Sequence, residues 1–300
     1  MLPVLVAIVV AAFCAGLALW RAEAAAPAAA AHVVFAIGIM PLILGAMSHF
    51  VPVLSRSREP PRGILRLPWL ALAAGILAVA SLGLPAPWRP GIGMAAAAGL
   101  AAGAVMAGWT LARGRAALGA PHPGLYWYVA SAAALALALA AALAWVALPQ
   151  HARELRLIHL HLNVLGFIGL AALGTLPVLL PTAAGRADPA AAPRLRGDLK
   201  FAASGTALAA AGAAWSPAVA LAGAALLAVP VWRLASGWVR THADAIVRRD
   251  GAAASLGWAL GGWALLLAHG VAHGLGLLPG RDAILGFVLV FLLPLVTGAV

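Results

Sequence analysis

The sequence predicts an all-α protein, a polytopic bundle of transmembrane helices. Hydrophobic residues make up 64% of the 300 residues and charged residues only 9%, and the mean hydropathy is +1.02. That leaves too little polar surface to cover a water-soluble globule. The apolar residues gather in runs of about 20, which at about 1.5 Å per helical residue cross a hydrocarbon layer about 30 Å thick. Their Ala, Leu and Gly content favours helices over barrel strands.

Ten spans are expected in a single transmembrane domain covering residues 1–300. In chain order they run over residues 2–20, 28–54, 67–86, 91–112, 125–149, 157–181, 201–215, 217–239, 252–278 and 283–300. The segments between them hold most of the arginines and many of the prolines, which interrupt apolar helices.

The distribution of positive charge predicts the orientation of the chain. Of the 19 Lys and Arg residues, 14 lie in or beside the loops that follow even-numbered spans, and five lie on the opposite side. The positive-inside rule then places the N-terminus in the cytoplasm, with the chain in a bacterial inner membrane among its lipids. The net charge of +11 is spread over short loops and span ends, so no nucleic-acid partner is expected.

Several histidines lie inside the predicted apolar spans, where a polar side chain needs a partner. With this orientation, five of them fall in the outer half of the membrane: His32, His159, His161, His269 and His273. Lipid offers no water to an imidazole, and heme iron or a metal ion is a partner that imidazole suits. The only cysteine, Cys14, supports neither a disulfide nor an iron–sulfur cluster. The other four histidines, His49, His122, His151 and His242, are expected to be solvated or interfacial.

A weak internal repeat links three of the spans. Gly45 and Pro52 follow His32 by 13 and 20 residues, and Gly174 and Pro181 follow His161 at the same distances. A third copy at the end of the chain has Leu285 in place of the histidine. The expected four-helix units cover residues 1–124, 125–250 and, in part, 251–300, and a complete third unit implies further spans after residue 300.

The segment from His159 to Gly185, with His161, Gly166, Phe167, Gly174 and Pro181, resembles the NnrS family of heme- and copper-containing membrane proteins. The four-helix period is more remotely similar to subunit I of heme–copper oxidases. The resemblance implies a role in respiration or nitric oxide metabolism. It nominates His159 and His161 as cofactor ligands and His32 as their counterpart in the first repeat. Leu162 stands where the family has glutamate, and Asn163 is the nearby amide.

Helical geometry constrains how these histidines act. Residues two apart on a helix point about 200° from each other, so His159 and His161 suit two different partners, such as a heme and a copper ion. His269 and His273, four apart, share a face and are candidate ligands of one metal ion. No Asp or Glu lies within the predicted spans, which disfavours proton pumping.

Heme is therefore the expected cofactor and copper a second candidate, with a periplasmic electron donor or a diatomic gas as partner. Whether the protein is an enzyme stays open at this point. Two other readings also stay open: a transporter whose histidines line a substrate path, and a membrane subunit without a cofactor.

Overall fold

The computed structural model describes residues 1–22, 26–84, 86–117, 119–247, 251–280 and 283–299, and in these ranges the regular structure is entirely helical. By contacts, the chain divides into two compact units, Met1–Asn163 and Val164–Val300. This division does not coincide with the expected repeat boundaries at residues 124 and 250. Each unit is described by itself.

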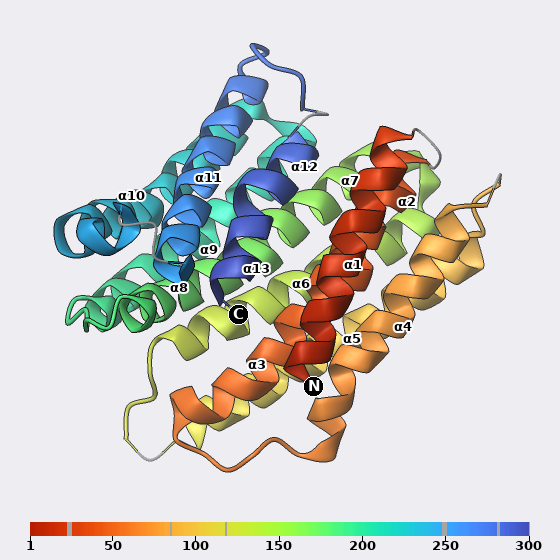
Figure 1. Ribbon diagram of the computed structural model, residues 1–300. Helices are drawn as coiled ribbons and strands as arrows, with labels where there is room; N and C mark the ends of the chain where they lie inside the picture. The colour runs from red at the N-terminus through yellow and green to blue at the C-terminus, as the bar shows by residue number, and fades with distance from the viewer. Residues whose placement is uncertain (23–25, 85, 118, 248–250, 281–282, 300) are drawn as a thin grey trace. The chain divides into compact units, whose positions relative to one another are not determined.

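The first unit holds the helices of the first half of the chain (Figure 1). They are α1 (Leu2–Arg21), α2 (Pro27–His32), the π-helix η1 (Val33–Ile39), α3 (Met40–Ser55), α4 (Arg62–Leu82), α5 (Arg89–Arg115), α6 (Gly124–Ala147), the short 3₁₀-helix η2 (Pro149–His151) and α7 (Ala152–His161). The segments α2, η1 and α3 are continuous, as expected for the second span. The unit is built mainly from packing of α5 on α4 and α6, of α1 on η1, and of α7 on α6.

The second unit begins inside another π-helix, η3 (Leu162–Ile168), which continues from α7. It then contains α8 (Gly169–Ala183), α9 (Ala191–Trp215), α10 (Pro217–Val247), α11 (Gly251–Gly274), α12 (Ala283–Gly286), the π-helix η5 (Phe287–Leu292) and α13 (Leu293–Ala299). Helix α10 packs along α9 and α11, and α11 packs on η5 and α13.

Eight of the described helices have the length and apolar composition needed to cross a membrane. Each of the ten predicted spans overlaps a helix in the described residues, but α4 and α11 end at Leu82 and Gly274, before their predicted ends. Helix α9 is not among the eight candidates, and the segment Ala283–Ala299 is shorter than the others. Helix α10 also extends to Val247, eight residues past the predicted end of its span. The structure thus has the predicted all-α, membrane-spanning character with eight candidate spans.

Backbone contacts at glycines bring helices close together in both units. A Cβ on Gly75 of α4 would collide with the backbone of Ala36 in η1, and one on Gly262 of α11 would collide with the backbone of Val290 in η5. Pro41 and Pro294 follow these two π-helices and have no N–H to donate to the preceding turn. In both units, then, a glycine lets a neighbouring helix approach a backbone turn whose hydrogen bonding is interrupted.

Candidate functional site

Two of the predicted site histidines lie together in the first unit. His32 is the last residue of α2, and His159 lies in α7. Their ring centres are 6.2 Å apart and their ring planes differ by 10°. Both side chains are half-buried. The fold therefore joins residues that are 127 positions apart in the sequence, on the two helices that the predicted repeat pairs.

Hydrogen bonds fix the same tautomer in both rings. The Nδ1–H of His159 donates to the carbonyl oxygen of Ala138 in α6, at 2.9 Å. The Nδ1–H of His32 donates to the carbonyl oxygen of Ala28, one turn earlier, at 2.7 Å. Because a carbonyl only accepts, Nδ1 carries the proton of each neutral ring, and Nε2 keeps its lone pair. Metal-binding histidines commonly use their second nitrogen in this way, donating it to a backbone carbonyl.

The spacing of the two rings suits one metal ion held between them. Two imidazoles that bind a metal from opposite sides, with bonds of about 2.0 Å and about 1.2 Å from nitrogen to ring centre, have centres about 6.4 Å apart. The observed separation of 6.2 Å is close to this value, and the two rings are stacked with nearly parallel planes.

His161 and Asn163 have different positions relative to this pair. The Nδ1–H of His161 donates to the carbonyl oxygen of Leu157 at 2.9 Å. Since α7 is an α-helix through both residues, His161 points about 200° away from His159. The amide nitrogen of Asn163 donates to the backbone oxygen of His159 at 2.8 Å and lies 3.4–3.5 Å from the ring nitrogens of His159. Asn163 thus lies beside the ring but makes its short bond to the backbone.

The other two predicted site residues, His269 and His273, lie in the second unit near the end of α11. The Nδ1–H of His273 donates to the carbonyl oxygen of Leu278 at 2.9 Å, and the Nε2–H of His269 donates to that of Pro279 at 3.3 Å. Both rings therefore contact the loop after their helix, and each has one nitrogen left as an acceptor. Joint metal binding by these two residues stays a prediction.

Among the four histidines expected to be solvated, His49 and His151 are exposed as predicted, and His122 is half-buried. The expectation for His242 is wrong: it lies on α10 and is 0% exposed. The cause is the extension of α10 beyond residue 239, which carries His242 into a packed helical turn. Sequence reasoning missed this residue because the arginines around it are typical of a solvated loop.

Within the described ranges, no group of three or more His, Cys, Asp or Glu side chains is close enough to hold a metal ion. Comparisons with protein-family models, curated proteins and solved structures find no match for this chain. The fold and the site define an all-α protein of the membrane-spanning type with a pair of histidines from separate helices.

Proposed function

We propose that this protein is a heme-binding membrane protein in which His32 and His159 would hold the iron. The observation that carries the proposal is the geometry of the two rings, which are 6.2 Å apart and differ by 10° in plane. Two protein ligands suffice for a heme iron because the porphyrin supplies the other four nitrogens. A single copper ion between the two imidazoles is the second candidate for the same position.

A heme held by His32 and His159 would supply one-electron transfer. The protein's part is to hold both rings in the tautomer that presents Nε2, through the carbonyls of Ala28 and Ala138. Because α6 supplies one of these carbonyls, the packing of α7 on α6 also orients the His159 ring. His161 points to the other side of α7 and is not part of this pair.

Three π-helices support the proposed repeat of four helices. The first follows His32 directly and the second follows His161 directly, and both are seven residues long. The third, Phe287–Leu292, begins two residues after Leu285, the position that corresponds to the histidines. Isolated π-helices are rare and concentrate at functional sites. Their recurrence at corresponding positions favours a common origin for these segments more strongly than the few identical residues do.

The proposed setting is the bacterial inner membrane, with the histidine pair near the outer surface and a periplasmic electron donor as partner. The resemblance of residues 159–185 to the NnrS family supports a role in respiration or nitric oxide metabolism. The orientation is tested with the variants Arg58→Cys and Arg89→Cys, each made in a chain that carries Cys14→Ser. A membrane-impermeant maleimide should label intact cells at residue 89 and not at residue 58. The reverse pattern would overturn the orientation.

The cofactor test uses the full chain, produced in cells supplied with heme and purified in a neutral detergent. We expect a Soret band and a low-spin spectrum, and about one heme per chain by pyridine hemochrome assay. His32→Ala and His159→Ala should each remove the low-spin signal, because each deletes one axial ligand. His161→Ala and His49→Ala serve as matched controls and should keep it. Melting curves of all four variants check that the chain still folds.

Three results would count against the proposal. If His161→Ala loses the low-spin signal and His159→Ala keeps it, His161 and not His159 is the ligand, and the proposal names the wrong residue. A colourless preparation that contains bound copper would show that the site binds copper and not heme. A colourless, metal-free preparation that moves solute into vesicles would instead favour a transporter.

A further inference from the structure

A group of arginines lies at one end of the first unit, where α3 ends, α4 begins and α5 ends (Figure 1). Two hydrogen bonds bring these segments together. The guanidinium of Arg113 donates to the backbone oxygen of Glu59 at 3.3 Å, and the backbone N–H of His122, just before α6, donates to that of Leu54 at 3.0 Å. We call the group the arginine surface, and it consists of Arg56, Arg58, Arg62, Arg66, Arg113 and Arg115.

The charge of the arginine surface is not neutralised by the protein. Glu59 is the one acidic residue in the sequence from residue 51 to residue 124, so six arginines against one glutamate give a net charge of +5. Five of the arginines are exposed, and Arg113 is half-buried. Among the described residues, no carboxylate lies within ion-pair distance of any of the six. These guanidinium groups are therefore accessible to a partner of opposite charge.

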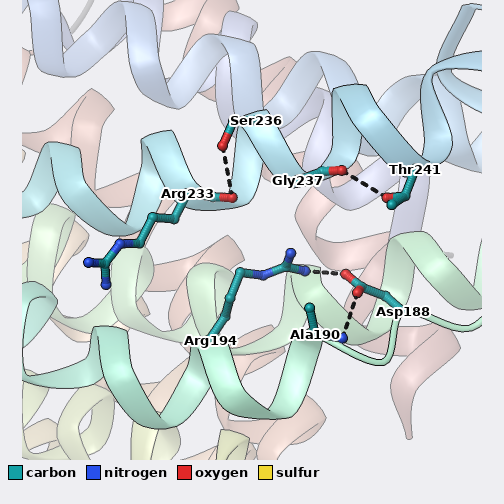
Figure 2. Close-up of polar contacts among 7 residues, drawn as sticks. All are labelled: Asp188, Ala190, Arg194, Arg233, Ser236, Gly237 and Thr241. Atoms are coloured by element: carbon teal, nitrogen blue, oxygen red, sulfur yellow. Dashed lines mark hydrogen bonds and ion pairs between the residues drawn. The ribbon is translucent and has the colours of Figure 1, made fainter.

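Three arginines of the second unit, by contrast, have carboxylate partners within the protein. Arg194 of α9 pairs with Asp188, beside the Gly237–Thr241 turn of α10 (Figure 2). The other two ion pairs are Arg186–Asp244 and Arg233–Asp198. A cluster of arginines without carboxylate partners thus distinguishes this end of the first unit.

Helix stability does not account for Arg62 and Arg66. Both lie in the first two turns of α4, which has no acidic residue in its first turn and no side-chain cap. The N-terminus of a helix carries a partial positive charge, so arginines are unfavourable there. At the end of α5 the helix dipole has the opposite sign and favours Arg113 and Arg115. The dipole therefore explains the arginines of α5 but not those of α4.

The face of α4 that carries Arg62 and Arg66 continues into an exposed apolar surface. At about 100° per residue, Trp69 lies within about 60° of both arginines around the helix axis. Its side chain is 42% exposed. The opposite face of α4 is buried in the unit and holds Ile64, Leu67 and Ala71. Two guanidinium groups thus precede an exposed aromatic ring on the outer face of one helix.

This order of side chains matches the structure of a phospholipid. Phosphate oxygens accept hydrogen bonds from guanidinium groups, and tryptophan is typical of the level where headgroups meet acyl chains. We propose that the arginine surface binds an anionic phospholipid, with its phosphate on Arg62 and Arg66 and an acyl chain along Trp69. The net charge of +5 favours an anionic lipid over a zwitterionic one, since clusters of about 4–8 basic residues beside a membrane helix attract anionic headgroups. A free phosphate ion would leave the exposed apolar face uncovered.

The test titrates the purified full chain, in neutral detergent, with an equimolar mixture of palmitoyl-oleoyl phosphatidylglycerol and phosphatidylcholine. Native mass spectrometry counts each lipid retained per chain, and phosphatidylglycerol should be preferred. Arg62→Gln combined with Arg66→Gln should weaken its binding about thirtyfold, the combined effect of two arginines beside an anionic headgroup. Arg62→Lys combined with Arg66→Lys should keep most of the binding, because lysine keeps the charge.

Arg21→Gln combined with Arg89→Gln is the matched control, because it removes the same charge from exposed arginines at the other end of the unit. This control should bind phosphatidylglycerol as the unaltered chain does. If it weakens binding as much as the α4 variant, net charge alone sets the affinity and the proposal is overturned. Equal retention of the two lipids would also overturn it, as would displacement of the lipid by an equal concentration of inorganic phosphate.

Melting curves without added lipid check that the variants fold. If the α4 variant does not fold, Arg58→Gln combined with Arg115→Gln decides the outcome, since both residues are exposed on the same surface. This variant should also weaken binding of phosphatidylglycerol, and unchanged affinity would overturn the proposal.

Discussion

The ion pair between Asp198 of α9 and Arg233 of α10 provides a sharp test of how these two helices are held together. Arg233 NH1 lies 2.7 Å from Asp198 Oδ1, and the two side chains are 50% and 5% exposed. The guanidinium also lies 5.4 Å from the ring centre of Phe201. The carboxylate is thus buried against a cation that still reaches solvent. Removal of Arg233 would leave the buried Asp198 carboxylate without its cation, and removal of Asp198 would leave Arg233 without its ion-pair partner.

The expected magnitude follows from this intermediate burial. Two unit charges about 3.5 Å apart attract by about 5 kcal/mol at an effective dielectric constant of about 20, before desolvation is subtracted. Charge-assisted hydrogen bonds contribute about 1.5–3 kcal/mol net. We therefore expect Asp198→Asn to lower the free energy of unfolding by about 2 kcal/mol. The coupling energy between Asp198→Asn and Arg233→Gln should be about 1.5 kcal/mol.

The assay is a double-mutant cycle on the full chain in detergent, measured by reversible unfolding. The pair Arg186–Asp244 serves as the matched control, because its atoms are 2.6 Å apart but its side chains are 50% and 52% exposed. Solvent screens an exposed pair, so the same cycle there should show no measurable coupling. A coupling below about 0.5 kcal/mol at Asp198–Arg233 would refute the argument that burial gives this pair its strength.

Three further predictions concern packing and backbone geometry. Trp263→Ala should lower the free energy of unfolding by about 3 kcal/mol, because its buried ring packs on Phe287 and Phe291, whereas Trp258→Ala, at a side chain that is 71% exposed, should have little effect. Gly205→Ala should lower the melting temperature, since the new Cβ would lie 2.8 Å from the backbone oxygen of Gly223, while Gly197→Ala, with open space around it, should raise stability by about 0.5–1 kcal/mol. Arg56→Gly should raise the free energy of unfolding by about 0.5–1 kcal/mol. Arg56 ends α3 with a left-handed φ of 50°, which glycine adopts without strain. Thermal melts of these variants in one detergent check all three predictions. Equal melting temperatures for the two tryptophan variants, or for the two glycine variants, would contradict the packing argument for that pair. A lower melting temperature for Arg56→Gly would contradict the backbone argument.

The sequence by itself determined the helical, membrane-spanning character of this protein. Continuous apolar runs leave a chain in lipid no other way to pair its backbone N–H and C=O groups than a helix, so the helical, membrane-spanning character can be predicted from composition and length. The exact spans cannot, since α9 is not among the eight candidate spans and α10 runs past its predicted end. The five candidate histidines, with His32 and His159 among them, could be found in the same way, because an imidazole in an apolar segment stands out whatever the packing is.

Only the tertiary structure decided which side chains meet. Between His159 and His161 the sequence left the choice open, and it was the packing of α7 on α6, with Ala138 as hydrogen-bond acceptor, that turned His159 toward His32. His242 shows the opposite failure: its arginine-rich surroundings suggested solvent, and the extension of α10 buried it. Both outcomes depend on the direction in which a helix presents a side chain and on where that helix ends. Those properties arise from contacts between residues far apart in the chain, which local sequence patterns do not contain.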